Sequence, residues 1–153
     1  MNKALTVIAL AAVLFLLLFA VLGYISRSGK APGLLDGALS PCPDKSNCVC
    51  SEHRDDSAHF IEPLPIADTP VVVAMQKLEK IISALGGRLE TSRENYIAAT
   101  FSSSLFGFVD DVEARADADA RVLHLRSASR IGHGDLGANR KRVEEIRRRF
   151  VDE

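Results

Sequence analysis

The chain has 153 residues, the usual size of a single domain, and shows no internal repeat. Its 19 basic and 20 acidic residues give a formal net charge of −1, so the overall charge does not favour nucleic acid as a partner, and we expect none. Hydrophobic residues make up 47% of the chain, and a large share of them precede residue 26. The composition therefore predicts an apolar N-terminal segment followed by one compact domain.

The N-terminal segment is expected to cross a membrane. The run from Ala4 to Ile25 contains no charged residue, and about 20 apolar residues span the hydrocarbon core of a bilayer. A cleaved signal peptide is the alternative, although its apolar region is usually shorter and its leader more basic. A lipid-modified cysteine is disfavoured because Cys42, the first cysteine, lies far beyond the run. We therefore predict a single-pass anchor over residues 1–25.

The charges flanking this run do not decide its orientation, because Lys3 and the α-amino group balance Arg27 and Lys30. The cysteines give a weak indication. Cys42 and Cys48 bracket a short polar loop that a disulfide can close, and disulfides persist in oxidising compartments. This favours an extracytoplasmic, periplasmic domain.

Two irregular segments are expected after the anchor. Residues 26–41 are rich in Gly, Ser and Pro without helical or strand periodicity, which predicts a linker. Residues 42–70 carry the cysteines, several prolines and a charged patch, and we expect them to lie over the domain surface without regular elements. The single domain is predicted to cover residues 42–153.

The rest of the domain is expected to contain two helices and four strands. Val71, Met75, Leu78 and Ile82 recur in steps of three and four, which predicts an amphipathic helix ending before Gly86. Four strands are predicted at residues 88–92, 96–103, 108–116 and 121–129. A final helix is predicted over residues 136–151, with Asp135 as its cap and Leu136, Val143, Ile146 and Phe150 on its apolar face. The predicted fold is α+β: a four-stranded antiparallel sheet with both helices packed on one face.

The register of the last two strands predicts a polar cluster. A turn at residues 117–120 places Val112 opposite Leu125 on the apolar face. On the other face Asp111 then meets Arg126, and Glu113 meets His124.

Asp110 points to the apolar side in this register, opposite Ser127. A carboxylate that enters the core side requires a partner, because an unpaired buried charge is costly. Asn139 and Arg140 flank the inward stripe of the last helix, so we expect Asp110 to contact one of them.

The segment between the last strand and the last helix, residues 127–135, is rich in small residues and leads into a helix N-terminus, where backbone N–H groups and nearby arginines can bind an anion. The candidate ligand-binding residues are Asp110, Asp111, Arg126, Ser127, Ser129, Arg130, Asp135, Asn139 and Arg140. The alternative is a purely structural ion network, which is the commoner arrangement in proteins. Strand alternation sends Asp110 and Asp111 to opposite faces, which argues against shared acid–base catalysis.

Cysteines and histidines also cluster between residues 42 and 59, but their spacing matches no standard zinc pattern. The cluster consists of Cys42, Cys48, Cys50, His53 and His59. No base or oxyanion site marks a nucleophilic cysteine, and His133 between two glycines suits a surface turn. A Cys42–Cys48 disulfide with Cys50 left over is favoured, and we expect no metal or other cofactor.

Three motifs in order resemble the family named domain of unknown function 1499. They are CPDKSNCVCS followed by HFIEPL, then SSSLFGFVDDVE, then RSASRIGHGDLGANRKRVEEIR. The resemblance covers residues 41–149 and implies no established activity, substrate or cofactor. The family's first motif usually continues with serine at the position of Cys50, which implies that Cys42 and Cys48 are the pair.

These observations predict a membrane-anchored domain that binds an anionic small molecule or lipid, or supports an envelope assembly, through the Asp110/Asp111 strand and residues 126–142. An enzyme of hydrolase-like type using the same residues is the alternative, and a non-enzymatic role is favoured. A protein-interaction module is a third possibility, indicated if Leu105, Phe106 and Phe108 form an exposed apolar patch. No catalytic residue can be assigned.

Overall fold

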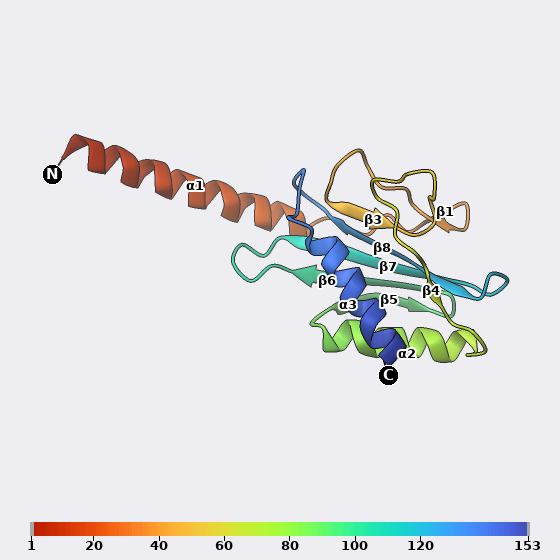
Figure 1. Cartoon of the computed structure of the whole chain (residues 1–153). Coiled ribbons are helices and arrows are strands. Elements are labelled where there is room, and N and C mark those ends of the chain that lie inside the picture. Colours follow the sequence, from red (N-terminus) through yellow and green to blue (C-terminus); the bar gives the residue numbers. More distant parts are fainter. Residues whose placement is uncertain (1, 153) are drawn as a thin grey trace.

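The computed structural model describes residues 2–152, so Met1 and Glu153, the outermost residues of the two predicted domains, lie outside it. A long N-terminal helix projects from an α+β domain that contains a six-stranded antiparallel sheet, a two-stranded sheet and two further helices (Figure 1). The helices are α1 (Lys3–Arg27), α2 (Val71–Ala84) and α3 (Ala138–Asp152).

The main sheet contains the predicted meander and two strands more. β5 (Arg88–Arg93), β6 (Tyr96–Ser102), β7 (Val109–Asp117) and β8 (Val122–Ser129) pair in sequence order, as expected. Two short strands, β3 (Cys48–Cys50) and β4 (Leu64–Pro65), pair with the outer edge of β8. The prediction of four strands was therefore incomplete, and part of the segment expected to be irregular covers a sheet edge.

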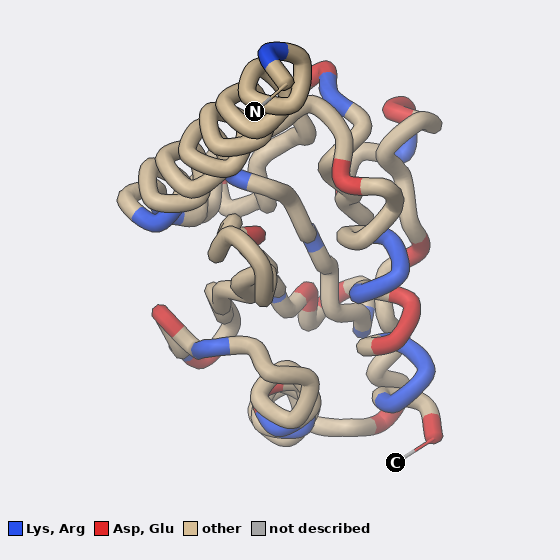
Figure 2. Tube along the Cα trace, turned by 90° about the vertical axis from the view of Figure 1, so that its left-hand side faces the viewer, with Lys and Arg blue, Asp and Glu red and all other residues tan. Residues whose placement is uncertain are grey.

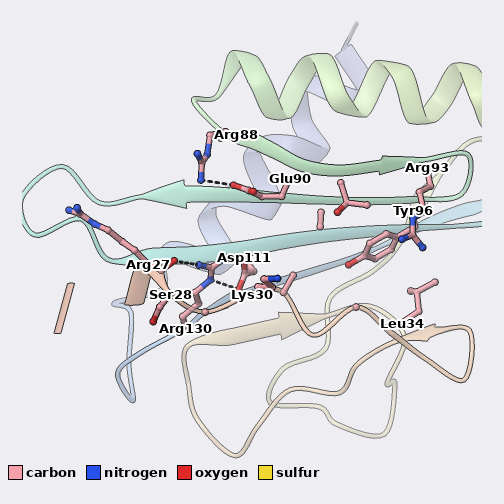
Figure 3. A pocket seen from close by; sticks show the side chains of 15 residues that line it. Arg27, Ser28, Lys30, Leu34, Arg88, Glu90, Arg93, Tyr96, Asp111 and Arg130 are labelled. Atoms are coloured by element: carbon pink, nitrogen blue, oxygen red, sulfur yellow. Dashed lines mark hydrogen bonds and ion pairs between the residues drawn. The ribbon is translucent and has the colours of Figure 1, made fainter. Parts of the chain in front are cut away.

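The hydrophobic core lies between one face of this sheet and the two helices, as predicted. Alternate sheet residues such as Ile97, Val112 and Leu125 join α2 residues such as Leu78 and α3 residues such as Ile146 in one buried cluster. The opposite face of the sheet carries polar side chains, and the chain segment that follows α1 covers much of it (Figures 1 and 3).

The predicted register of β7 and β8 was wrong by two residues. Val112 lies opposite Ser127 and Glu113 opposite Arg126, so Asp111 faces Ala128 instead of Arg126. The connecting turn lies one residue further along the chain, with Arg121 in the left-handed region at φ 55°. A shift of two residues leaves every side chain on its predicted face, because strand side chains alternate with a period of two.

The segment expected to be a featureless linker contains a hairpin formed by β1 (Leu34–Leu35) and β2 (Ala38–Leu39). Asp36 and Gly37 at its turn both have positive φ, the conformation that tight hairpin turns require. Leu39 is buried against Cys50 and Tyr96, so the segment packs on the outer face of the sheet.

Helix α1 is apolar over most of its length and long enough to cross a membrane, a property that signal sequences share. Figure 2 shows that charged residues occur only near the two ends of this helix. Its C-terminal turn packs on the domain, where Gly23 and Ser26 are buried.

The start of the last helix differs from the prediction. Leu136 has φ 55° and is 98% exposed, so it precedes α3 and does not belong to its apolar face. Asp135 does act as a cap, because its carboxylate accepts from the Gly137 and Asn139 backbone N–H groups at 2.9 and 2.7 Å.

Candidate functional site

The predicted site residues separate into two networks on opposite faces of the sheet. Ser127, Ser129, Asn139, Asp135 and Asp110 lie on the side of the helices, consistent with their hydrogen bonds to one another and to α3. Asp111, Arg126 and Arg130 lie on the outer face. The sheet itself separates the two groups, so they do not form a single site.

The network on the helix side centres on Asn139, which is 1% exposed. Its amide nitrogen donates to the Asn47 carbonyl at 3.0 Å and to the Asp135 carboxylate at 2.8 Å. Its amide oxygen accepts from the Ser127 hydroxyl at 2.6 Å and from Arg142 at 2.7 Å. With each amide atom already bonded within the protein, Asn139 joins α3 to the sheet and to the loop before β3.

The partner of Asp110 is Arg142, at 2.7 Å, and neither Asn139 nor Arg140. The expectation was correct in the face of Asp110 and wrong in the partner. In the observed register Asp110 lies opposite Ser129 instead of Ser127, and Asn139 contacts Ser127. The Arg142 guanidinium also lies 4.6 Å from the ring centroid of Phe101. Arg140 instead donates to the carbonyls of Ala58 and Phe60, both at 3.3 Å.

On the outer face, Glu113 is the centre of the second network and is fully buried. Its carboxylate accepts from Arg126 at 3.0 Å, from the Tyr96 hydroxyl at 2.7 Å and from the Gly33 backbone N–H at 2.9 Å. Burial, together with this hydrogen bond to Glu113, raises the pKa of Tyr96. The bond from Gly33 fastens the segment after α1 to the sheet.

Asp111 and Arg130 form a bidentate ion pair at 2.7 and 2.8 Å. The hydrogen bonds to Asp111 raise the pKa of Arg130, against the opposing effect of burial. Arg130 also donates to the carbonyls of Ser26 and Arg27, both at 3.3 Å, at the C-terminal end of α1. The pair therefore links the sheet to the end of the apolar helix.

A groove of about 660 Å³ lies beside this pair, between β5 and the segment that follows α1. Figure 3 shows Arg88, Glu90 and Arg93 along one side of the groove and residues Lys30 to Leu34 along the other. Tyr96, Asp111 and Arg130 contribute to its floor and to the end near α1.

The groove is basic in a chain that is slightly acidic overall. Five basic and two acidic side chains line it, a net charge of +3 against −1 for the whole chain. Both acids already have cationic partners: Glu90 pairs with Arg88 at 2.7 Å and Asp111 with Arg130.

The other three cations of the lining have no carboxylate partner within residues 2–152; they are Arg27, Lys30 and Arg93. Lys30 and Arg93 lie toward opposite ends of the groove, whereas Arg27 points to the β6–β7 loop, against Gly107 (Figure 3). Unpaired cations in a concave site attract an anion of matching size.

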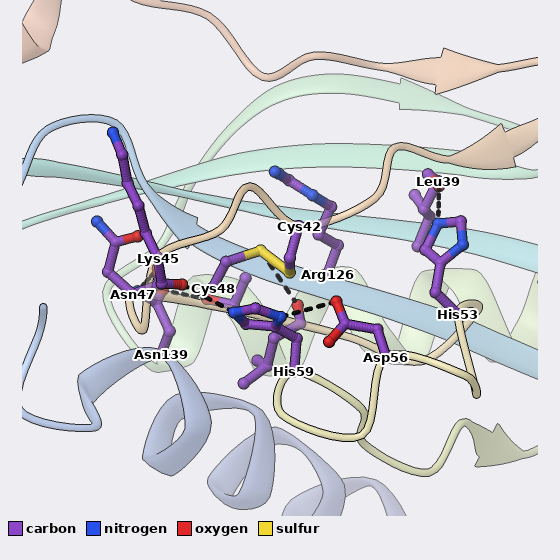
Figure 4. Close-up of a disulfide and its surroundings, with 12 residues drawn as sticks. Leu39, Cys42, Lys45, Asn47, Cys48, His53, Asp56, His59, Arg126 and Asn139 are labelled. Atoms are coloured by element: carbon purple, nitrogen blue, oxygen red, sulfur yellow. Dashed lines mark hydrogen bonds and ion pairs between the residues drawn. A yellow bond between two sulfur atoms is a disulfide. The ribbon is translucent and has the colours of Figure 1, made fainter. Parts of the chain in front are cut away.

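The cysteine region forms a disulfide and no metal centre. Cys42 and Cys48 are bonded, with their Cα atoms 5.7 Å apart, and Cys50 is free and buried (Figure 4). His59 contacts the Asp56 carboxylate at 2.7 Å and the Lys45 carbonyl at 2.9 Å, while His53 contacts the Leu39 carbonyl at 3.0 Å. The two histidines are thus used in holding loops, and residues 2–152 contain no cluster suited to a metal ion.

A second hollow, of about 460 Å³, lies between the disulfide and the start of α3, where Arg140, Asp135 and His133 line it. Lys45 and Arg140 are balanced there by Asp44 and Asp135, so this hollow has no net attraction for an anion. The predicted anion site at the N-terminus of α3 therefore has weaker support than the groove.

Two of the residues that line the groove, Asp111 and Arg130, were among the ligand-binding candidates named from the sequence, and its other lining residues were not. Lys30 lies in the supposed linker and Arg93 next to a hairpin turn, positions at which solvated charges are common. Only the packing of residues 29–39 on the sheet brings them to one groove, and no local pattern signals that packing.

Comparison with known proteins identifies a family. No curated protein sequence matches the chain. A family model described as protein of unknown function (DUF1499) matches residues 38–150, which include β2 and the whole of the main sheet. The chain therefore belongs to the DUF1499 family of proteins of unknown function.

Proposed function

We propose that this chain is a single-pass membrane protein whose extracytoplasmic domain binds an anionic, phosphate-bearing ligand in the groove between β5 and the segment after α1. The observation that carries the proposal is the net charge of +3 in the groove lining, with Lys30 and Arg93 lacking carboxylate partners in the described chain.

The contacts of α1 support a retained anchor over a cleaved signal. The Ser26 side chain is 1% exposed, and its hydroxyl accepts from the Val109 backbone N–H at 2.6 Å. Arg130 binds the last carbonyls of the helix, and the ring of Phe19 packs on Phe106 with centroids 5.3 Å apart. Cleavage near the end of the helix would remove the Phe19 contact and leave the Phe106 ring exposed.

The disulfide supports the extracytoplasmic side. Cys42 and Cys48 close a loop of sequence separation 6, and such bonds persist in compartments that keep thiols oxidised. With the domain on that side of the membrane, the groove at the end of α1 lies at the height of the lipid headgroups.

Binding is better supported than catalysis. The two carboxylates of the groove are engaged by Arg88 and Arg130, and the raised pKa of Tyr96 keeps its hydroxyl protonated. The groove therefore offers cationic and hydrogen-bonding groups and no free general base. A phosphate group suits such a site, whether it belongs to a lipid headgroup or to a soluble molecule.

The test uses the full chain in nanodiscs of neutral phosphatidylcholine. One arm adds inorganic pyrophosphate and measures heat of binding; the other incorporates phosphatidylglycerol and counts retained lipids by native mass spectrometry. Each cation near a membrane surface contributes about 1 kcal/mol to the free energy of binding an anion. The double variant Lys30→Gln, Arg93→Gln is therefore expected to weaken binding by about 30-fold.

The control variant Arg54→Gln, Lys141→Gln removes the same charge from exposed positions away from the groove, and its affinity should match that of the parent chain. Binding in the first arm alone assigns a soluble phosphate compound, and binding in the second alone a lipid. Equal affinity of the two double variants, or absence of binding in both arms, would overturn the proposal. A mass lacking residues 1–23 in membrane-purified protein would overturn the retained anchor.

A further inference from the structure

The β6–β7 loop, residues 103–108, packs beside the apolar helix and not merely at its end. The ring of Phe19 lies 5.3 Å from that of Phe106 and 6.1 Å from that of Phe108, measured between centroids. Gly23 lets the Phe106 backbone approach the helix so closely that a Cβ at this position would collide with the Phe106 carbonyl. Part of the loop is thus fixed at a known level along α1.

That level is inside the membrane if α1 spans it. The apolar run from Ala4 to Ile25 is about 33 Å long at a rise of about 1.5 Å per residue, and the hydrocarbon core is about 30 Å thick. Only about two residues at the ends can therefore protrude without shortening the buried run. Phe19 lies about 9 Å below Ile25 along the axis, so the rings packed on it are below the headgroups.

The loop has the properties that an inserted segment requires. Leu105 is 80% exposed and has no role in the protein core. The backbone N–H groups of Gly107 and Phe108 donate to the carbonyl and hydroxyl of Ser103 at 3.1 and 3.0 Å, and Ser103 itself donates to the Phe108 carbonyl at 2.8 Å. Internal hydrogen bonds of this kind lower the cost of placing loop backbone in an apolar layer.

A second loop presents an apolar side chain on the same side of the domain. Residues 130–137 connect β8 to α3 beside the C-terminal end of α1, where Arg130 binds the helix carbonyls (Figure 1). Leu136, at 98% exposure, is the most exposed large apolar residue of the described chain, and Leu105 is the next. The two most exposed large apolar side chains of the described residues therefore lie on the two loops near the C-terminal end of α1.

We infer that Leu105 and Leu136 insert into the interface of the same leaflet that α1 enters, so that the domain rests on the bilayer and is not merely tethered to it. The partner surface is the boundary between lipid headgroups and acyl chains. The inference rests on the proposed membrane anchor, and it places the basic groove in the headgroup layer.

The chain contains no tryptophan, so single Trp substitutions report one position each. The full chain is reconstituted into two sets of vesicles, one with acyl chains brominated close to the headgroups and one with acyl chains brominated near their ends, so that both shallow and deep positions are reported. Leu105→Trp and Leu136→Trp are the test variants. Val73→Trp, half-exposed on α2, is the aqueous control, and Leu14→Trp within α1 reports insertion of the anchor itself.

We expect the Leu105→Trp and Leu136→Trp chains to lose emission in brominated vesicles, to emit at shorter wavelength than Val73→Trp, and to resist quenching by iodide. Leu14→Trp should also lose emission, whereas Val73→Trp should respond to iodide alone. If iodide quenches both loop variants while bromine quenches Leu14→Trp, the inference of loop insertion is overturned and the proposed membrane anchor is not. Protection of the loop variants from both quenchers indicates a covering protein surface and also overturns it. Failure of bromine to quench Leu14→Trp overturns anchor and insertion together.

Discussion

Replacing Glu113 by glutamine should destabilise the domain strongly, although the two side chains have nearly the same shape. The Glu113 carboxylate is fully buried and accepts hydrogen bonds from Arg126, Tyr96 and Gly33. The amide oxygen of Gln can still accept from Tyr96 and Gly33. Its NH₂ group must then face the Arg126 guanidinium, so one donor meets another and a buried cation loses the carboxylate with which it pairs.

The magnitude follows from this geometry. Removing one partner of a buried ion pair costs about 3–5 kcal/mol, because the remaining charge stays desolvated. The side chain of Arg126 is only 7% exposed, so solvent does little to relieve the loss. We therefore expect Glu113→Gln to reduce the free energy of unfolding by about 3 kcal/mol, and Arg126→Met to have a similar effect. The double variant should lose less free energy of unfolding than the two single losses added together, by about 2 kcal/mol or more, because it leaves no unpaired charge at this position.

In the assay, the full chain is unfolded with urea in detergent micelles, and pulse proteolysis measures the fraction of the α+β domain that is unfolded. Glu62→Gln is the matched control, since its exposed pair with Arg54, at 3.4 Å, should contribute less than about 0.5 kcal/mol. A loss below about 1 kcal/mol for Glu113→Gln, or strictly additive single effects, would refute the contribution assigned to the buried Glu113–Arg126 pair.

Three further predictions concern the rest of the domain. Arg142→Met should reduce the free energy of unfolding by about 2 kcal/mol and Arg140→Met by about 1 kcal/mol, because Arg142 forms part-buried hydrogen bonds with the Asp110, Ser127 and Asn139 side chains whereas Arg140 binds backbone carbonyls; equal urea midpoints would contradict this assignment. Without reductant, thiol labelling should modify no cysteine in the folded chain and one in the unfolded chain, and it should modify three once the unfolded chain is reduced. Reduction of the disulfide should lower the free energy of unfolding by about 2 kcal/mol. Burial raises the pKa of the Cys50 thiol, so labelling of Cys50 in the folded chain would contradict its buried position. Burial lowers the pKa of His124 below its ordinary value of 6.5, so the unfolded chain binds a proton more readily and stability should fall as pH drops from 6.5 toward the folded-state pKa. His124→Gln should flatten this part of the stability profile, exposed His133→Gln should not, and identical slopes in both variants would exclude His124 as the cause.

Sequence patterns made the four longer strands of the main sheet, β5 to β8, and the helices α2 and α3 predictable. Parts of β7 and β8 alternate between apolar and polar residues, and α2 has an apolar stripe at helical spacing. The register of β7 and β8 was not predictable in the same way, because two even-numbered turns one residue apart put the same residues on each face. The left-handed conformation of Arg121 selects between them, and no glycine or asparagine at that position signals it.

The edge strands and the groove were unpredictable for a different reason. β3 and β4 contain three and two residues, too few for any period to be visible, and the neighbouring edge of β8 is what makes them strands. In the same way, Lys30 and Arg93 are ordinary surface charges in the sequence and acquire a shared role only through tertiary packing. Sequence reasoning put the polar side chains of β7 and β8 on the correct faces but gave Asp111 and Glu113 the wrong partners. It also missed the contacts that arise when an irregular segment folds back over the sheet.

That irregular segment determines how the apolar helix α1 is connected to the domain. Ser26 binds Val109, Gly33 binds Glu113, and Leu39 is buried against the sheet, so the chain is fastened at three successive points after the helix. The segment is therefore held against the sheet, and it is not the flexible Gly/Ser-rich linker that its composition predicts. The same residues form one wall of the basic groove and supply carbonyl acceptors to Arg130. A chain lacking residues 2–33 would therefore lose most of this wall and the Gly33 hydrogen bond to Glu113, which is why groove binding and domain stability must both be measured on the full chain.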